Sequence, residues 1–174
     1  MPTPNHLKGL VVRDDTEFDE EPLVAPVRCP CGGEVFELLY PGQPHDWNGE
    51  TVPCVAKVGG NFFLVLKVRC NTCEREHLLL DKDEHGYNGY VCHDPDQSSL
   101  PRPHLTSWRC LVCNGTGHRV VLTIRTAGRV HFEGETEGAF DTESWPEAFS
   151  WFRLGARCVV CDRDTPDLID YETM

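Results

Sequence analysis

One short pattern occurs four times in this chain: an arginine followed by two cysteines that are separated by one or two other residues. The four copies are VRCPC at 27–31, VRCNTC at 68–73, WRCLVC at 108–113 and ARCVVC at 156–161. A loop with this spacing lets two sulfurs reach one ion, and structural Zn²⁺ sites commonly take two ligands from each of two such loops. Four pairs in one chain therefore predict a fold that is held together by metal centres.

The rest of the sequence favours metal over disulfides. The N-terminal stretch MPTPNHLKGLVVRDDTEFDEE has no apolar core of the length that a signal peptide needs. No run of about 18 apolar residues exists that would span a membrane. We therefore expect a cytoplasmic protein, in whose reducing surroundings paired cysteines indicate metal binding before disulfides.

The four pairs are not identical. Three are C-x-x-C, whereas the first is C-x-C with Pro30 at its centre. Proline stiffens this short loop and lacks an amide that could bond a sulfur, so we expect the centre that contains it to be the less regular one. The residue after the second cysteine often needs a left-handed conformation, which Gly32, Asn114 and Asp162 tolerate and for which Glu74 is a poor choice.

Strand-rich stretches separate the first pair from the second and the third from the fourth. In this arrangement the chain resembles the zinc-ribbon (zinc β-ribbon) superfamily over 28–75 and 108–163, where two cysteine knuckles top β-hairpins and clamp one structural zinc. The resemblance implies two Zn²⁺ ions, one held by Cys29, Cys31, Cys70 and Cys73 and the other by Cys110, Cys113, Cys158 and Cys161. Spacing also allows a centre that combines the pair 70/73 with the pair 110/113. If one ligand is assigned wrongly, we expect it in the first centre, where Cys54 or Cys92 would take its place. Iron is the alternative metal.

We expect a small, mostly-β (α+β) fold of two zinc-ribbon-like modules with β-hairpins. The expected organisation is a flexible acidic segment at 1–27, a first module with an insertion at 28–93, a proline-rich linker at 94–107, and a second module with a C-terminal tail at 108–174. Strand-like patterns occupy 34–40, 51–58, 61–69, 76–81, 118–126 and 129–134, with a glycine turn at 59–60 and a turn-rich loop at 85–90. One short helix is predicted near 145–153, with Ser144 as its N-cap and Glu147 completing a capping box.

The arginine before each pair has a plain physical use. Four thiolates around one Zn²⁺ carry a charge of about −2, and a neighbouring guanidinium offsets it or bonds a nearby carbonyl. This prediction concerns Arg28, Arg69, Arg109 and Arg157.

A third site is conceivable among the residues that the four pairs leave over. His77, His85, Cys92 and His93 lie in a stretch dense in Asp, Glu, His and Cys, which can mark hydrolytic metal chemistry. Motifs of the H-E-x-x-H type are missing from it, and adjacent residues of a strand point to opposite faces. A metal-dependent hydrolase therefore remains an alternative, behind a non-enzymatic function.

The formal net charge of −12 bears on possible partners. Nucleic-acid affinity rests largely on Lys and Arg, so a nucleic-acid-associated zinc ribbon is a second alternative that the acidity opposes, although tryptophans such as Trp108 and Trp151 lie beside arginines. The leading hypothesis is a structural-zinc protein that acts as an acidic protein-interaction module, for example an inhibitor or immunity protein. Its charge favours a basic protein as partner, and the sequence leaves the oligomeric state open.

Overall fold

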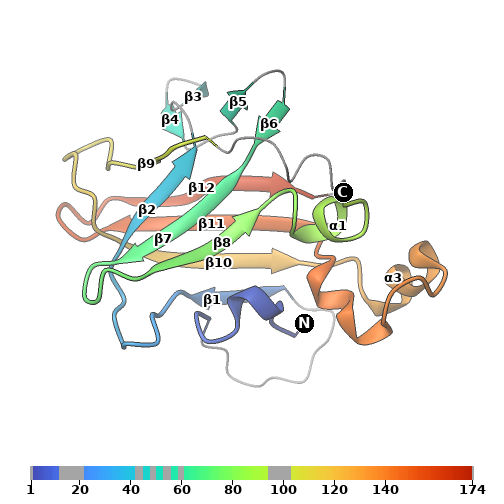
Figure 1. The fold of residues 1–174 in the computed structure, drawn as a ribbon. Helices are drawn as coiled ribbons and strands as arrows, with labels where there is room; N and C mark the ends of the chain where they lie inside the picture. The colour runs from blue at the N-terminus through green and yellow to red at the C-terminus, as the bar shows by residue number, and fades with distance from the viewer. Residues whose placement is uncertain are drawn as a thin grey trace.

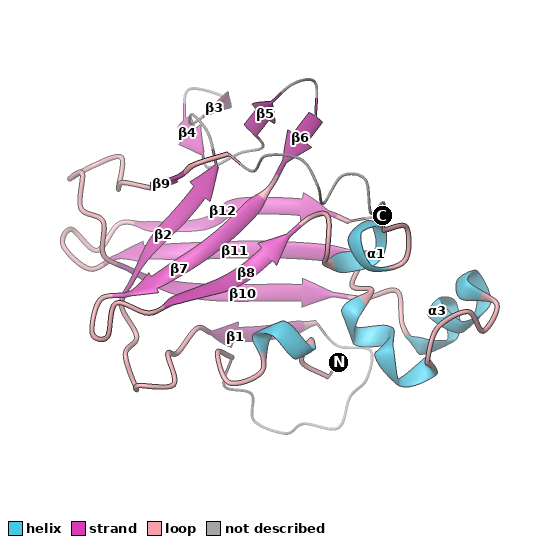
Figure 2. Cartoon of the chain, in the orientation of Figure 1, coloured by secondary structure: helices cyan, strands magenta, loops and turns pink. Residues whose placement is uncertain are grey.

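The structure is a computed structural model that describes residues 2–11, 22–41, 45–47, 50–52, 56–58, 61–93 and 103–173. It confirms a small, mostly-β fold, built on an antiparallel sheet of eight strands with few helices (Figure 1, Figure 2). The strands of this sheet are β1 (Leu23–Pro26), β2 (Phe36–Pro41), β7 (Val65–Cys70), β8 (Glu76–Asp81), β9 (Leu105–Ser107), β10 (His118–Arg125), β11 (Trp151–Cys158) and β12 (Asp164–Glu172). The other elements are the hairpins β3 (His45–Trp47) with β4 (Glu50–Val52) and β5 (Ala56–Val58) with β6 (Asn61–Phe63), and the helical segments η1 (Asn5–Leu7), α1 (Gly86–Tyr90), α3 (Arg129–Thr136) and η2 (Thr142–Glu147).

The sheet consists of two halves with the same construction. In each half a cysteine knuckle leads into one strand, a second strand returns antiparallel to a second knuckle, and a third strand follows. These strands are β2, β7 and β8 in the first half and β10, β11 and β12 in the second. A single ladder pair, Phe36 with His118, joins β2 of the first half to β10 of the second. In Figure 1, β2 and β7 cross in front of β10 to β12, and the knuckle loops lie toward the left.

The strand before each first knuckle pairs with the opposite half. β1 pairs with β10, which places Pro26 opposite Val121, and β9 pairs with β2, which places Ser107 opposite Leu39. The two halves therefore exchange strands reciprocally. The ranges expected as a flexible segment and as a linker each contribute one of these strands, while the acidic run at 14–21 lies outside the described residues.

One apolar core fills the space between the halves. Burial alternates along β10, so Val120, Leu122 and Ile124 face inward, as the sequence pattern predicts. They belong to one buried cluster with residues of the first half such as Leu38 and Val68. Because a single cluster spans both halves, the sheet folds back on itself like a two-layered sandwich.

The helical region between β10 and β11 differs from the prediction. Residues 129–134, expected as a strand, begin helix α3, because a helical spacing of four turns Phe132 and Thr136 toward the core and leaves Val130 exposed. The helix expected near 145–153 is the 3₁₀ segment η2 at 142–147, and strand β11 begins at Trp151.

The cap of η2 also differs from the prediction. Asp141, not Ser144, is its N-cap, and the Asp141 carboxylate accepts a hydrogen bond from the Glu143 amide at 3.1 Å. Ser144 lies inside the segment. The predicted capping box therefore does not form, because the helical turn begins three residues earlier.

Smaller differences concern the first half. The turn-rich stretch at 85–90 contains helix α1, and the strand expected at 61–69 is divided into β6 and β7. The predicted hairpin around 59–60 is confirmed by the pairing of β5 with β6. Among the described residues, no helix combines the length and the hydropathy that crossing a membrane requires.

Candidate metal centres

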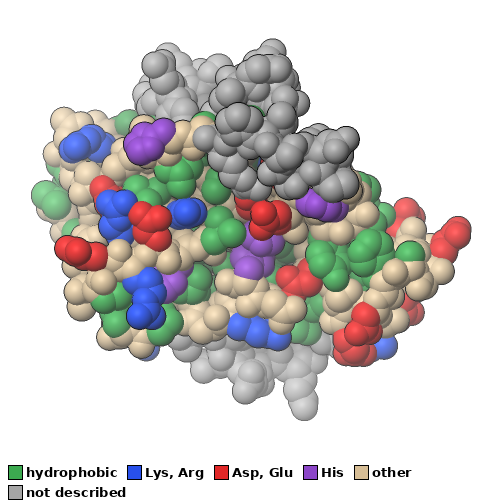
Figure 3. Space-filling view, viewed as in Figure 1, with side chains coloured by type: hydrophobic (Ala, Val, Ile, Leu, Met, Phe, Trp, Pro, Cys, Tyr) green, Lys and Arg blue, Asp and Glu red, His purple; other side chains and the backbone are tan. Residues whose placement is uncertain are grey.

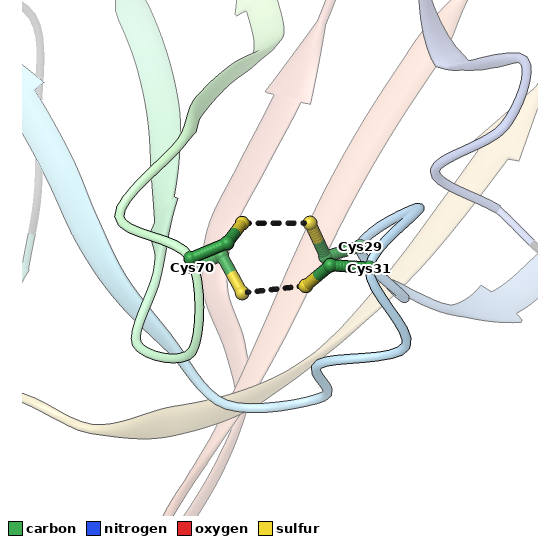
Figure 4. Close-up of side chains that lie close together, drawn as sticks. Cys29, Cys31 and Cys70 are labelled. Atoms are coloured by element: carbon green, nitrogen blue, oxygen red, sulfur yellow. Dashed lines mark hydrogen bonds between the residues drawn. The ribbon is translucent and has the colours of Figure 1, made fainter.

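The structure brings the eight paired cysteines together as two groups of four. The first centre contains Cys29, Cys31, Cys70 and Cys73, and the second contains Cys110, Cys113, Cys158 and Cys161. Within each group all four sulfurs lie within 4.8 Å of one another. In Figure 4, Cys29 and Cys31 on one loop face Cys70 on the opposite loop. This is the grouping that the zinc-ribbon resemblance implies, without cross-pairing between the modules.

The distances between the sulfurs fit a tetrahedral ion. The Sγ atoms of Cys29 and Cys73 are 3.6 Å apart, and those of Cys110 and Cys161 are 3.5 Å apart. Four sulfurs at about 2.3 Å from one Zn²⁺ lie about 3.8 Å from one another, whereas a disulfide needs about 2.05 Å. Four protein sulfurs fill the tetrahedron and leave no position for a substrate, which is typical of a structural centre rather than a catalytic one.

The three C-x-x-C knuckles share one backbone geometry. The amide of each first cysteine donates to the carbonyl five residues later, as from Cys70 to Arg75 at 2.9 Å, and the amide four residues later donates back to the cysteine carbonyl at 2.8–3.0 Å. The residue that donates back has a positive φ in all three: 59° at Glu74, 58° at Asn114 and 61° at Asp162. The left-handed position expected from the sequence is therefore present, including at Glu74, where it is strained.

The first knuckle is the same turn shortened by one residue. The amide of Cys29 donates to the Gly33 carbonyl at 2.8 Å, and the amide of Gly32, with φ 87°, donates back to Cys29 at 2.7 Å. A Cβ atom at Gly33 would lie 2.6 Å from the Cys70 sulfur. The short loop therefore requires glycine at both positions after Cys31.

The shorter first knuckle offers fewer backbone amides to its buried sulfur than the longer knuckles do. Burial alone would raise the pKa of Cys70, but hydrogen bonds from the amides of Cys73 and Thr72 and from neighbouring thiols lower it to about 6. In the second centre, the same pattern lowers the pKa of Cys110 to about 7. Burial raises the pKa of Cys29 to about 12, and only the Cys31 amide opposes this. In the second centre the pKa of Cys113 is likewise raised to about 12, so the first centre is the less regular one in its shorter first knuckle rather than in its thiol pKa values.

The missing amide is a consequence of loop length. In the longer knuckles the second and third residues after the first cysteine supply the amides, so the position of Pro30 is not one of them. In the short knuckle the third residue is Gly32, whose amide bonds a carbonyl instead of a sulfur. The expectation that proline removes the amide therefore needs this correction.

Two positions that sequence reasoning missed complete the knuckles. In every knuckle, the amide of the first cysteine donates a hydrogen bond to a backbone carbonyl that closes the turn. This carbonyl belongs to Gly33 or Gly115 in the first knuckle of each half, and to Arg75 or Arg163 in the second. A signal for them exists, because the first knuckles read RCPCGG and RCLVCNG, and the second read RCNTCER and RCVVCDR. The repeat is therefore longer than the cysteine pairs, and it pairs the first knuckle with the third and the second with the fourth.

The arginines before the pairs form ion pairs rather than contacts with sulfur. Arg69 donates to Glu37 at 2.9 Å and to Glu76 at 2.7 Å, and the other carboxylate partners are Glu34 for Arg28 and Asp162 for Arg157. Arg109 reaches the carbonyl of Asn114 at 3.4 Å, a long contact. The guanidinium groups are about half exposed, so each pair adds little stability by itself.

His77 contacts the first centre, although the sequence placed it in a separate cluster. Its Nε2 lies 3.3 Å from the Cys29 sulfur, a distance at which an N–H donates to a thiolate. Burial and the charge of Arg75 lower the pKa of His77. Hydrogen bonds of this kind orient metal ligands and support their charge.

The other residues of that cluster lie apart. His85 stacks on His6 with ring centroids 3.7 Å apart, His93 Nδ1 lies 2.9 Å from the Asp83 carbonyl, and Cys92 is exposed. Among the described residues, only the two cysteine groups bring three or more potential metal ligands together. Cys54 lies outside the described residues.

Both centres lie at the same end of the sheet. Cys70 pairs with Phe36, Phe36 with His118, and His118 with Cys158, so one ladder row connects the two. All four side chains are buried, and three strand spacings correspond to about 14 Å. The helices α1 and α3 lie toward the opposite end (Figure 2). Comparison of the chain with protein-family models, curated proteins and solved structures gave no match.

Proposed function

We propose that this protein carries two structural zinc ions in zinc-ribbon-like modules, with the eight paired cysteines as ligands. The observation that supports this most strongly is the spacing of the sulfurs across each centre, in knuckles with matching backbone turns. The distances are 3.6 Å for Cys29–Cys73 and Cys31–Cys70, and 3.5 Å for Cys110–Cys161 and Cys113–Cys158. The thiol chemistry agrees, because the lowered pKa values of Cys70 and Cys110 provide a thiolate in each centre near neutral pH.

Native mass spectrometry with elemental analysis tests this proposal directly. We expect two zinc ions per chain, and one ion in each of two variants, Cys70→Ser and Cys158→Ser. These substitutions each remove one buried ligand, so they separate the centres. A chain purified without chelators that binds no metal, or a variant that still binds two ions, contradicts the assignment.

We further propose that the protein acts through contact with another protein. Support comes from the tips of the second centre, where the residues between the cysteines are large, apolar and exposed. They are Leu111, Val112, Val159 and Val160, with exposed fractions of 50%, 67%, 42% and 70%. Much of their apolar surface is open to solvent, and an apolar patch on a metal-bound turn is typical of an interaction surface.

The corresponding tips of the first centre are Pro30, Asn71 and Thr72, which are exposed as well but not strongly apolar. Holding a metal ion does not require apolar tips, since the first centre has the same ligands without them. The apolar tips of the second centre therefore support a role in contact with another protein. The charge of −12 favours a basic partner around this apolar patch.

Affinity capture with a matched pair of baits tests the interaction. The first bait is the zinc-loaded protein and the second is its Val112→Ser/Val160→Ser variant. We expect partners that the variant loses while it keeps two zinc ions, and we expect elution at moderate salt for a basic partner. Identical capture by both baits contradicts the role of the knuckle tips, while a nuclease-sensitive, steeply salt-dependent partner would indicate a nucleic acid instead.

A further inference from the structure

A groove lies on the outer face of the second half, the face of β10 and β11 that points away from the core. Its volume is about 570 Å³, which is within the range of small-molecule sites. Val121, Thr123 and Gly155 line its floor, and Pro26 and Pro166 stand on its two sides. Val121 is 42% exposed, so the floor presents apolar surface to solvent.

A bulge in β12 builds one wall of this groove. Between the pairs Leu154–Ile169 and Ala156–Thr165, β12 contains two residues more than β11. The extra length passes close to β11 at Gly155, where a Cβ atom would lie 2.8 Å from the Pro166 carbonyl oxygen. The bulge therefore requires glycine at this position, and the glycine also leaves the floor open.

Arginines line the end of the groove nearest the second centre. Arg119 lies directly opposite Arg157 in the ladder, and Arg28 lines the groove as well. Glu34 pairs with Arg28, and Asp162 pairs with Arg157. Among the described residues, no carboxylate oxygen forms an ion pair with Arg119 within 4.0 Å, and the charge of Asp162 acts on it only from farther away. The N–H donors of Arg119 are therefore available to a ligand.

The equivalent face of the first half differs in its charges, because its basic and acidic side chains pair with one another. The position equivalent to Arg119 is Glu37, which pairs with Arg69, the equivalent of Arg157. The position of Gly155 is taken by Lys67, which pairs with Glu76 at 3.7 Å. On the corresponding face in Figure 3, basic and acidic side chains lie next to one another. At the equivalent place, the second half presents Arg119 opposite Arg157 instead of a carboxylate opposite an arginine.

We propose that this groove binds a small organic carboxylate with an apolar body. The Arg119 guanidinium offers two parallel N–H donors that match a carboxylate, and Val121 with the two prolines accommodates the apolar part. Glu34 and Asp164 also line the groove, and their charge opposes a phosphate dianion more strongly than a monoanion. The proposal is independent of the partner of the knuckle tips.

Titration by NMR with a simple probe tests the site. The zinc-loaded, ¹⁵N-labelled chain is titrated with 4-phenylbutyrate, and with 4-phenylbutyramide as the neutral control. A probe of this size should bind at millimolar concentration and shift the amide signals of Val121, Thr123 and Gly155. We expect binding of the amide to be at least about tenfold weaker, since it lacks the charge-assisted hydrogen bonds to Arg119.

Two variants and one control assign the binding to the groove. Arg119→Gln and Val121→Glu should each weaken binding about tenfold or more, the first by removing the cation and the second by adding a carboxylate beside it. Arg125→Gln, on the same face of the same strand but outside the groove, should leave binding unchanged. The proposal is overturned by the absence of saturable shifts at the groove, by equal binding of acid and amide, or by unchanged binding in both variants.

Discussion

Gly33 allows a direct test of how closely the short knuckle is packed against its metal. Replacement with alanine adds one methyl group whose carbon would lie 2.6 Å from the Cys70 sulfur and 3.0 Å from the Thr72 hydroxyl oxygen. Ordinary contacts of this kind are about 3.5–4.0 Å long, so about 1 Å of overlap must be relieved. The sulfur cannot move away without leaving the ion, and the loop cannot move without breaking the bond from the Cys29 amide to the Gly33 carbonyl.

Overlap of this size in a packed region costs about 1–3 kcal/mol. Since about 1.4 kcal/mol corresponds to a factor of ten, Gly33→Ala should weaken zinc binding in the first centre about tenfold to a hundredfold. Gly115 occupies the equivalent place in the second centre, but there the nearest atom is Val160 Cγ2 at 3.1 Å, followed by the Cys113 sulfur at 3.2 Å. The exposed valine can turn away, so Gly115→Ala should weaken the second centre by less than about threefold.

Competition with a chromophoric chelator measures both effects, because it releases the two ions in separate steps. Gly134→Ala is the control, since no atom lies within 4 Å of its added methyl group and alanine favours helix α3. Its zinc affinities should equal those of the wild type. The steric account is refuted if Gly33→Ala binds zinc as tightly as the wild type, or if the two knuckle variants lose affinity equally.

Four further predictions follow from the knuckles and the core. His77→Phe removes the hydrogen bond to the Cys29 sulfur and should weaken zinc binding in the first centre about 10- to 100-fold while sparing the second, as read by the same chelator competition. Glu74→Gly relieves a left-handed backbone at φ 59° and should stabilise the zinc-loaded protein by about 1 kcal/mol in urea unfolding, whereas Asn114→Gly should gain less; equal gains would contradict the strain at Glu74. Zinc affinity of both centres should fall as the pH is lowered from 8 to 6, with release of protons on binding in calorimetry, because thiols such as Cys29 must lose a proton to bind metal. Burial and the neighbouring His6 lower the pKa of His85 from 6.5 to about 3, so the unfolded chain binds a proton below pH 6.5 that the folded chain binds only near pH 3. Stability should therefore decrease as the pH falls below about 6.5, by roughly 1 kcal/mol more at pH 5.5 in the wild type than in His85→Gln, a difference that titration of the thiols common to both proteins does not affect.

The elements with a strong local signal are those that the sequence predicted. The alternation of apolar residues along 118–126 and the glycine turn at 59–60 are signals carried by neighbouring residues of the chain. Strand β10 and the hairpin of β5 with β6 therefore form as expected. The grouping of the cysteines is also present, because a tetrahedral ion and two tight loops leave few arrangements. What the sequence could not show is which strands pair between the halves. The partners of β1 and β9 depend on the packing of the whole sheet rather than on their own three or four residues.

The helical insertion shows the limit of pattern reading. The stretch RVHFEG alternates well enough to indicate a strand, yet it pairs with none of the described strands. Helix α3 instead satisfies its own backbone and buries Phe132, with an ion pair from Arg129 to Glu133 on its exposed side. His77 was missed for a different reason: its distance from Cys29 along the chain gives no hint that the bend between β7 and β8 returns it to the metal centre.

The reciprocal exchange of β1 and β9 gives this single chain the architecture of a domain-swapped homodimer. Phe36 and His118 are equivalent residues of the two halves, and their antiparallel pairing is what a two-fold axis between identical subunits would produce. In a true homodimer every substitution occurs twice, and both copies of a surface must change together. Here each half has its own sequence, so Arg69 pairs with Glu37 in the first half while Arg157 lies opposite Arg119 in the second. The knuckle tips likewise differ, with Asn71 and Thr72 in the first half and Val159 and Val160 in the second. A change in one half therefore does not have to be matched in the other, and one pseudo-symmetric sheet can carry two different surfaces.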